Sequence, residues 1–154
     1  MVRPQARLTV PILLVVVVAS SCGSGPSKQD VISKWDSICR STQQRLSTVQ
    51  VPNVNSPDDL HRFYLAMRTA LPIALSELDQ LRAVEVPKDD QETVDGILSN
   101  LVRAADQLNV AKRDARKGDL KGTERAIKRS SRYTKAAGTA ARAYGFQVCG
   151  KSSA

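Results

Sequence analysis

Four stretches of regularly spaced apolar residues restrict this chain to a helical fold. From Lys28 onward, apolar residues recur at alternating intervals of three and four, and breaks that contain proline or glycine separate the stretches. This spacing places apolar side chains on one face of a helix. Aromatic residues make up only 4% of the chain, which also favours helices over a sandwich or barrel. The pattern therefore predicts four amphipathic helices.

The breaks set the expected limits of these helices. Their approximate ranges are 28–49, 56–86, 88–117 and 119–144. Short connections between helices of similar length favour antiparallel neighbours. We therefore expect an all-α, antiparallel up-down-up-down four-helix bundle over 28–149, with the second helix kinked at Pro72.

The fourth expected helix turns mostly small residues toward the core. Its inward stripe consists of Leu120, Thr123, Ile127, Ser130, Thr134, Ala137, Ala141 and Tyr144. Small residues allow helices to approach closely but bury little area per turn. Trp35 and Tyr64 lie on the stripes of the first two helices and are interpreted as core residues. A cavity lined by Trp35, Met67 and Ala137 would indicate a ligand carrier, whereas a filled core would exclude one.

The first 21 residues have the organisation of a secretory leader. Arg3 and Arg7 precede an apolar run over 8–18, which is too short to cross a hydrocarbon core of ~30 Å. Small residues then lead into Cys22. This end resembles the lipobox of bacterial lipoproteins, with Ala19 standing where leucine is preferred.

The lipobox resemblance implies cleavage before Cys22 and lipidation of its thiol. Residues 22–27 would then be the lipidated cysteine and a flexible tether, and the lipid would hold the protein at the extracytoplasmic face of the cell membrane. The alternative is ordinary secretion, with cleavage nearby and a free thiol at Cys22.

The three cysteines form an odd set, which needs an explanation in an exported protein. Once Cys22 is assigned to lipid, Cys39 and Cys149 remain as a pair in an oxidising compartment. In the expected bundle, the segment after Gly145 can turn back, lay Phe146 against the helices and bring Cys149 to Cys39. We therefore expect one disulfide, Cys39–Cys149, followed by a disordered end over 150–154. The alternative is two unpaired thiols.

Several short motifs extend over nearly the whole chain after the leader. They are a cysteine in the first helix (Cys39), Leu78, Leu81 and Pro87 at the end of the second, Gly118-Asp119 before the fourth, and Gly145-Phe146-Gln147-Val148-Cys149. In these motifs the chain resembles a broad group of small predicted lipoproteins of actinobacteria and similar bacteria. The resemblance implies the helical fold and the lipid anchor. It implies no activity, because we know of none established for the group.

Basic residues are concentrated in the last part of the chain. Residues 112–142 contain 11 basic and 3 acidic residues, whereas 28–111 contain 9 basic and 12 acidic. Five of the basic residues, here called the basic stripe, share one helix face: Lys121, Arg125, Lys128, Arg132 and Lys135. The stripe is either a solvated face or a contact with anionic lipid, an anionic envelope polymer or an envelope protein. Nucleic acid is not expected, because no aromatic residues are interleaved for stacking.

The sequence offers no chemistry for catalysis. His61 is the only histidine, so no transition-metal site is expected, and phosphate loops and catalytic triads are missing. Acidic residues fall at helix starts, where the helix dipole favours them. We expect no enzyme, cofactor, metal or catalytic residue. The leading hypothesis is a non-enzymatic binding or structural module that uses the basic stripe, and the alternative is a carrier of a small apolar ligand held in the bundle.

Overall fold

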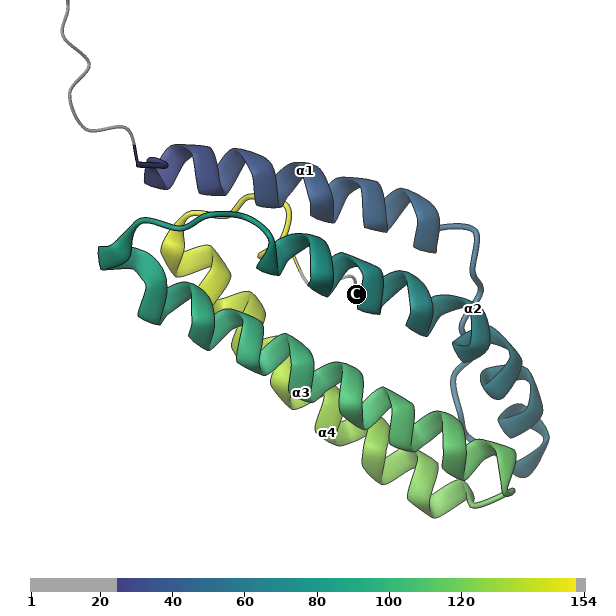
Figure 1. Cartoon of the computed structure of the whole chain (residues 1–154). Helices are drawn as coiled ribbons and strands as arrows, with labels where there is room; N and C mark the ends of the chain where they lie inside the picture. Colours follow the sequence, from purple (N-terminus) through teal and green to yellow (C-terminus); the bar gives the residue numbers. More distant parts are fainter. Residues whose placement is uncertain (1–24, 152–154) are drawn as a thin grey trace, which may run out of the picture.

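The regular elements of residues 25–151, the part of the chain that the computed structural model describes, are all helical. They are α1 (Lys28–Leu46), α2 (Pro57–Arg82), the 3-10 turn η1 (Lys88–Asp90), α3 (Gln91–Arg116) and α4 (Leu120–Tyr144). Figure 1 shows successive helices running in opposite directions, so the predicted up-down-up-down four-helix bundle is confirmed. The expected leader and Cys22 lie outside the described residues.

Short-range hydrogen bonds fix where the helices begin and end. At the start of α1, the Asp30 amide donates to Ser27 Oγ, and Asp30 Oδ2 accepts from the Ser27 amide at 3.0 Å. The Ser27 hydroxyl also donates to Asp30 Oδ2, at 2.6 Å. This bond and the one from the Ser27 amide stabilise the carboxylate and hold the pKa of Asp30 below its ordinary value. The predicted first helix ran to Val49, but α1 ends three residues earlier. There the Ser47 and Thr48 hydroxyls donate to backbone carbonyls of the last turn, a local alternative to further helix.

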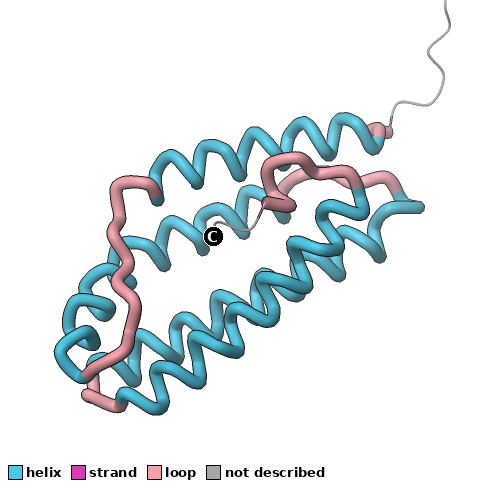
Figure 2. The backbone as a smooth tube through the Cα atoms, turned by 180° about the vertical axis from the view of Figure 1, so that it is seen from behind, coloured by secondary structure: helices cyan, strands magenta, loops and turns pink. Residues whose placement is uncertain are grey.

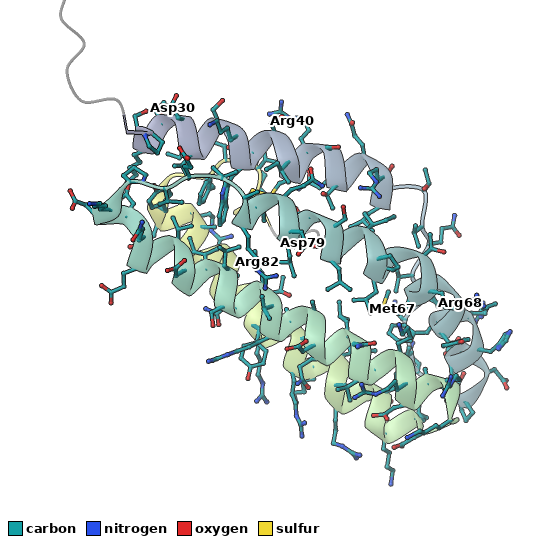
Figure 3. All side chains as sticks on the ribbon, viewed as in Figure 1. Asp30, Arg40, Met67, Arg68, Asp79 and Arg82 are labelled. Carbon is teal, nitrogen blue, oxygen red and sulfur yellow. A yellow bond between two sulfur atoms is a disulfide. The ribbon has the colours of Figure 1, made fainter. Side chains whose placement is uncertain are left out.

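Helix α2 is bent, and its two halves therefore pack against different parts of the bundle. Figures 1 and 2 show the bend, and Figure 3 shows Met67 and Arg68 close to it. Pro72 follows one turn later and lacks the amide that would bond the Arg68 carbonyl. The kink expected from Pro72 is present. The first half of α2 covers one end of α3 and α4, whereas the second half runs back beside α1.

The bend separates two main apolar clusters at opposite ends of the bundle. The disulfide cluster consists of Val31, Trp35, Cys39, Leu81, Val94, Ile97, Ala137, Ala141, Tyr144 and Phe146. The far cluster consists of Leu60, Phe63, Met67, Ala70, Ala111, Ala115 and Ala126. Between them, α3 and α4 form the most extensive helix pair, with Ser130 Oγ donating to the Ala104 carbonyl at 3.0 Å. The small inward face predicted for the fourth helix thus allows this close approach.

Candidate functional site

The segment after α4, residues 145–151, folds back over the bundle and is called the tail. Gly145, which ends α4, has a φ of 121°, and this left-handed backbone starts the reversal. The disulfide Cys39–Cys149 then joins the tail to α1, with the two Cα atoms 5.4 Å apart. The predicted pairing is therefore confirmed. It links residues 110 positions apart in the chain.

Asp36 holds the tail through its carboxylate. The backbone amides of Gln147, Val148 and Cys149 all donate to it, at 2.8, 2.8 and 3.0 Å. Asp36 is buried, and a buried carboxylate needs such donors to offset its lost hydration. This clamp was not predicted from the sequence. A signal was present, because Asp36 lies between Trp35 and Cys39 on the inward side of the first helix.

Aromatic rings fill the space under the tail. Phe146 is buried and stacks on Trp35, with ring centroids 4.8 Å apart, and its centroid lies 4.9 Å from that of Tyr144. The Tyr144 hydroxyl donates to Asp90 Oδ2 at 2.8 Å. Burial, helped by this bond, raises the pKa of Tyr144 to about 12. The predicted packing of Phe146 against the bundle is confirmed.

The end of the tail is also fixed. Arg142 donates to the Gly150 carbonyl, and Gly150 is buried beneath the Arg142 side chain. The sequence placed the start of a disordered end at position 150. Residues 150 and 151 are instead described as part of the tail, and 152–154 lie outside the described residues.

A cavity of about 230 Å³ lies between the disulfide cluster and the middle of the bundle. All four helices and the tail line it, and most of the lining side chains are apolar. These are Trp35, Cys39, Leu46, Ala74, Leu78, Ile97, Leu101, Ala104, Ala105, Leu108, Ala137, Ala141 and Cys149. Two of the three residues named for a carrier cavity, Trp35 and Ala137, are among them. Met67 is not, because it packs in the far cluster.

The cavity is not closed off from solvent. Gln43 and Lys151 line it and are exposed, so the opening lies near them. Helices α1 and α4 make little direct contact, and the backbone of the tail passes between them (Figure 2). The tail therefore forms part of the wall between the cavity and solvent.

Two side chains of the cavity wall, Trp35 and Glu77, carry polar groups that are relevant to a ligand and have no partner among the described residues. Trp35 is fully buried, and its Nε1 has no hydrogen-bond acceptor. Glu77, on the second half of α2, forms no ion pair or side-chain hydrogen bond there. Burial raises the pKa of Glu77 to about 7. The sequence interpretation missed Glu77, although it sits beside Leu78 on the inward stripe.

The basic stripe lies away from this cavity on the outside of α4. Its five side chains are all exposed. No ion pair engages any of them within residues 25–151, where the two ion pairs are Arg62–Asp59 and Arg82–Asp79. The stripe is therefore a continuous run of uncompensated positive charge along one helix. This geometry is compatible with both of its interpretations, a solvated face and an anionic contact.

A second concentration of positive charge follows from the bend in α2. Arg68 lies at an open groove of about 380 Å³ that Lys112, Arg113 and Arg116 of α3 also line. The remaining lining residues, Tyr64 and Asn109, are uncharged. Tyr64, interpreted as a core residue, is half-buried and packs on the far cluster at the edge of this groove.

His61 is exposed at the start of α2. Within residues 25–151, no three potential metal-ligating side chains come together. No described helix combines the length and hydropathy needed to cross a bilayer. Comparisons of the chain with protein-family models, curated proteins and solved structures found no match.

Proposed function

We propose that this protein is a lipid-anchored extracytoplasmic binding protein whose bundle takes up a small apolar ligand in the central cavity. The observation that carries the proposal is the cavity itself. Ligand sites are typically concave and mostly apolar, with a few polar groups in the wall. This pocket of about 230 Å³ has a mostly apolar lining and opens to solvent near Gln43 and Lys151, so a small apolar ligand could enter it and lose contact with water there.

The size of the cavity limits the ligand. An engineered apolar cavity of ~150 Å³ in another protein binds benzene. Benzene has six non-hydrogen atoms. At the same volume per atom, the cavity of about 230 Å³ would hold a ligand of about nine non-hydrogen atoms. The lining of alanine, leucine and isoleucine side chains favours a hydrocarbon or aromatic body.

The location in the proposal rests on the leader and on Cys22. Lipidation at Cys22 would anchor the chain in the membrane five residues before Ser27, the N-cap residue of α1. The start of α1, the start of α3 and the end of α4 lie at the same end of the bundle (Figure 1). That end would face the membrane, and the groove at Arg68 would lie at the opposite end. Intact mass of the native protein tests the anchor: acyl mass that disappears in Cys22→Ser supports it, and unmodified Cys22 contradicts it.

Ligand binding can be followed through Trp35, the only tryptophan in the chain, because it lines the cavity. The helices, the apolar clusters and the disulfide are formed by residues 27–151, so a bundle domain of residues 23–154 is suitable for solution work. We expect toluene to change Trp35 fluorescence saturably. Ala74→Leu, which fills the cavity, should abolish the change.

The matched control is Ala136→Leu, because Ala136 is exposed on α4 outside the cavity. This variant should bind toluene like the unmodified domain. A domain that shows no saturable response to toluene, or an Ala74→Leu variant that binds as well as the control, would contradict the proposed function.

A second candidate function is contact between the basic stripe and anionic envelope material. The observation in its favour is five exposed cations without ion pairs within the described residues, each worth ~1 kcal/mol near a charged surface. Lys128→Glu/Arg132→Glu should weaken binding of the bundle domain to anionic vesicles at low salt. The matched control is Lys34→Glu/Arg40→Glu, which makes the same charge change on the exposed face of α1. Equal loss in both variants would mean that net charge alone matters.

A further inference from the structure

Within residues 25–151, Glu77 is the only acidic side chain that lines the central cavity. It is half-buried, and the α2 residues that line the cavity with it, Ala74 and Leu78, are apolar. Buried carboxylates in proteins are normally paired with a cation or with several hydrogen-bond donors. Asp36 follows this rule in the same molecule, because three amides surround it. Glu77 has no equivalent group among the described residues.

The charged groups around Glu77 do not supply a partner. On the cavity wall, α1 contributes the neutral side chains Thr42 and Gln43, and α4 contributes Thr134. The only other charged residue of the lining is Lys151 in the tail, which is exposed and forms no ion pair with Glu77. Arg40 is next to Cys39 in sequence, but Figure 3 shows it pointing away from the other helices.

We propose that the ligand of the central cavity is a small apolar amine, whose ammonium group pairs with the Glu77 carboxylate while its hydrocarbon part lies against the alanine and leucine walls. This inference rests on the proposed function and adds the class of ligand. The ammonium group would replace the part of its hydration that the half-buried Glu77 carboxylate has lost. A charge-assisted bond of this kind in an apolar site is stronger than one between neutral groups.

The proposal predicts a pH dependence of binding. In the free protein, burial raises the pKa of Glu77 to about 7. A bound ammonium favours the ionised carboxylate, so its pKa falls in the complex. Amine affinity should therefore rise as the pH increases from 5 to 7 and level off above it. Alkylammonium groups, like lysine, stay protonated through this range.

Four probes of nearly equal size test the charge separately from the cavity: toluene, benzyl alcohol, benzylamine and benzoate. At pH 8 we expect the bundle domain to bind benzylamine roughly 10- to 100-fold more tightly than toluene. Glu77→Gln should remove this preference and the pH dependence while keeping toluene binding. Glu85→Gln is the matched control, because Glu85 is exposed and does not line the cavity.

The outcomes separate this inference from the proposed function. If toluene binds and benzylamine binds no more tightly, the cavity does take up apolar ligands but the proposal of an amine ligand is wrong. Tighter binding of benzyl alcohol than of benzylamine would also overturn the amine, and would indicate a ligand whose oxygen accepts a hydrogen bond from Trp35 Nε1. Tighter binding of benzoate would overturn it too, and would indicate an anionic ligand paired with Lys151. If none of the probes binds, the proposed function itself fails.

Discussion

The inner face of α1 meets two different environments along its length. At its first half, Trp35 is stacked on Phe146, Asp36 is bonded to three amides and Cys39 is tied to the tail. One to two turns later, Thr42 and Leu46 border the central cavity. The same helix thus belongs to a densely bonded end and to a loosely filled middle.

The difference shows what holds α1 in the bundle. Its contacts with α4 are few, so the tail provides the connection at the disulfide end through covalent, polar and aromatic contacts. In the middle of the bundle, no disulfide, hydrogen bond or aromatic stacking within residues 25–151 joins α1 to α4. Stability is therefore expected to depend mainly on the contacts that hold the tail, and the proposed binding on the cavity wall. Trp35 and the disulfide belong to both.

The largest effect should come from removing the disulfide. Cys39→Ser/Cys149→Ser opens a loop that spans 110 positions, and the chain-entropy model gives a loss of about 4 to 5 kcal/mol. Urea unfolding of the bundle domain, followed by Trp35 fluorescence, measures this loss. A change below about 1 kcal/mol would mean that the tail stays docked without the covalent link.

Asp36→Asn should have the next largest effect. The amide has one acceptor oxygen in place of a charged carboxylate that serves three donors, so we expect a loss of about 3 kcal/mol in the free energy of unfolding. Asp95→Asn is the control, because Asp95 is exposed and forms no hydrogen bond from its side chain among the described residues. Equal stability of the two variants would show that the clamp contributes little.

Glu77 should make the middle of the bundle sensitive to pH. Its pKa is raised from 4.5 to about 7 on folding, so the folded state holds this proton more tightly than the unfolded state. Its contribution to stability therefore decreases as the pH rises from about 4.5 to 7 and changes little above 7. Glu77→Gln should be more stable than the unmodified domain by about 2 kcal/mol at pH 8, allowing for partial exposure of the carboxyl.

The comparison at pH 4 completes this prediction. Glu77 is then protonated in both states, and the Glu77→Gln difference should shrink to near zero. Glu85→Gln should follow the unmodified domain at both pH values, because Glu85 is exposed. A constant difference across the pH range would contradict the buried position of Glu77.

The smallest expected changes in the free energy of unfolding have opposite signs in the tail and in the central cavity. Gly150→Ala adds a methyl group 2.6 Å from Arg142 Cγ and 3.1 Å from the Phe146 carbonyl, and overpacking of this kind should cost about 2 kcal/mol. Ala74→Leu instead fills the cavity and should stabilise the domain by about 1 kcal/mol. Thermal unfolding measures both, and destabilisation by Ala74→Leu would indicate that the middle is already filled.

Much of the disulfide end could be predicted from the sequence. The spacing of apolar residues gave the four helices, the glycine at 145 marked the reversal, and the cysteine count gave Cys39–Cys149. Asp36 was missed because its three partners are backbone amides of a segment more than 100 residues away. Hydrogen bonds of this kind depend on tertiary structure and leave no local pattern.

The cavity could be anticipated only in part. From the sequence, a ligand cavity was only the alternative hypothesis, and two of the three residues named for it, Trp35 and Ala137, do line the cavity. Met67 does not, because the bend turns the first half of α2 toward the far cluster. The direction of a kink depends on which surfaces the two half-helices bury, and the sequence pattern does not encode it. Glu77 was missed for a different reason: a charged residue beside an apolar stripe is normally solvated, and only the tertiary structure places it in a cavity wall.

A crystal structure of the bundle domain under xenon pressure would test the central cavity most directly. Xenon enters apolar cavities that lack water and ligand. We expect a xenon atom between Trp35, Ala104 and Ala137, and no xenon at this position in Ala74→Leu. A core at this position that is filled by side chains and takes up no xenon would contradict the cavity and the function proposed from it.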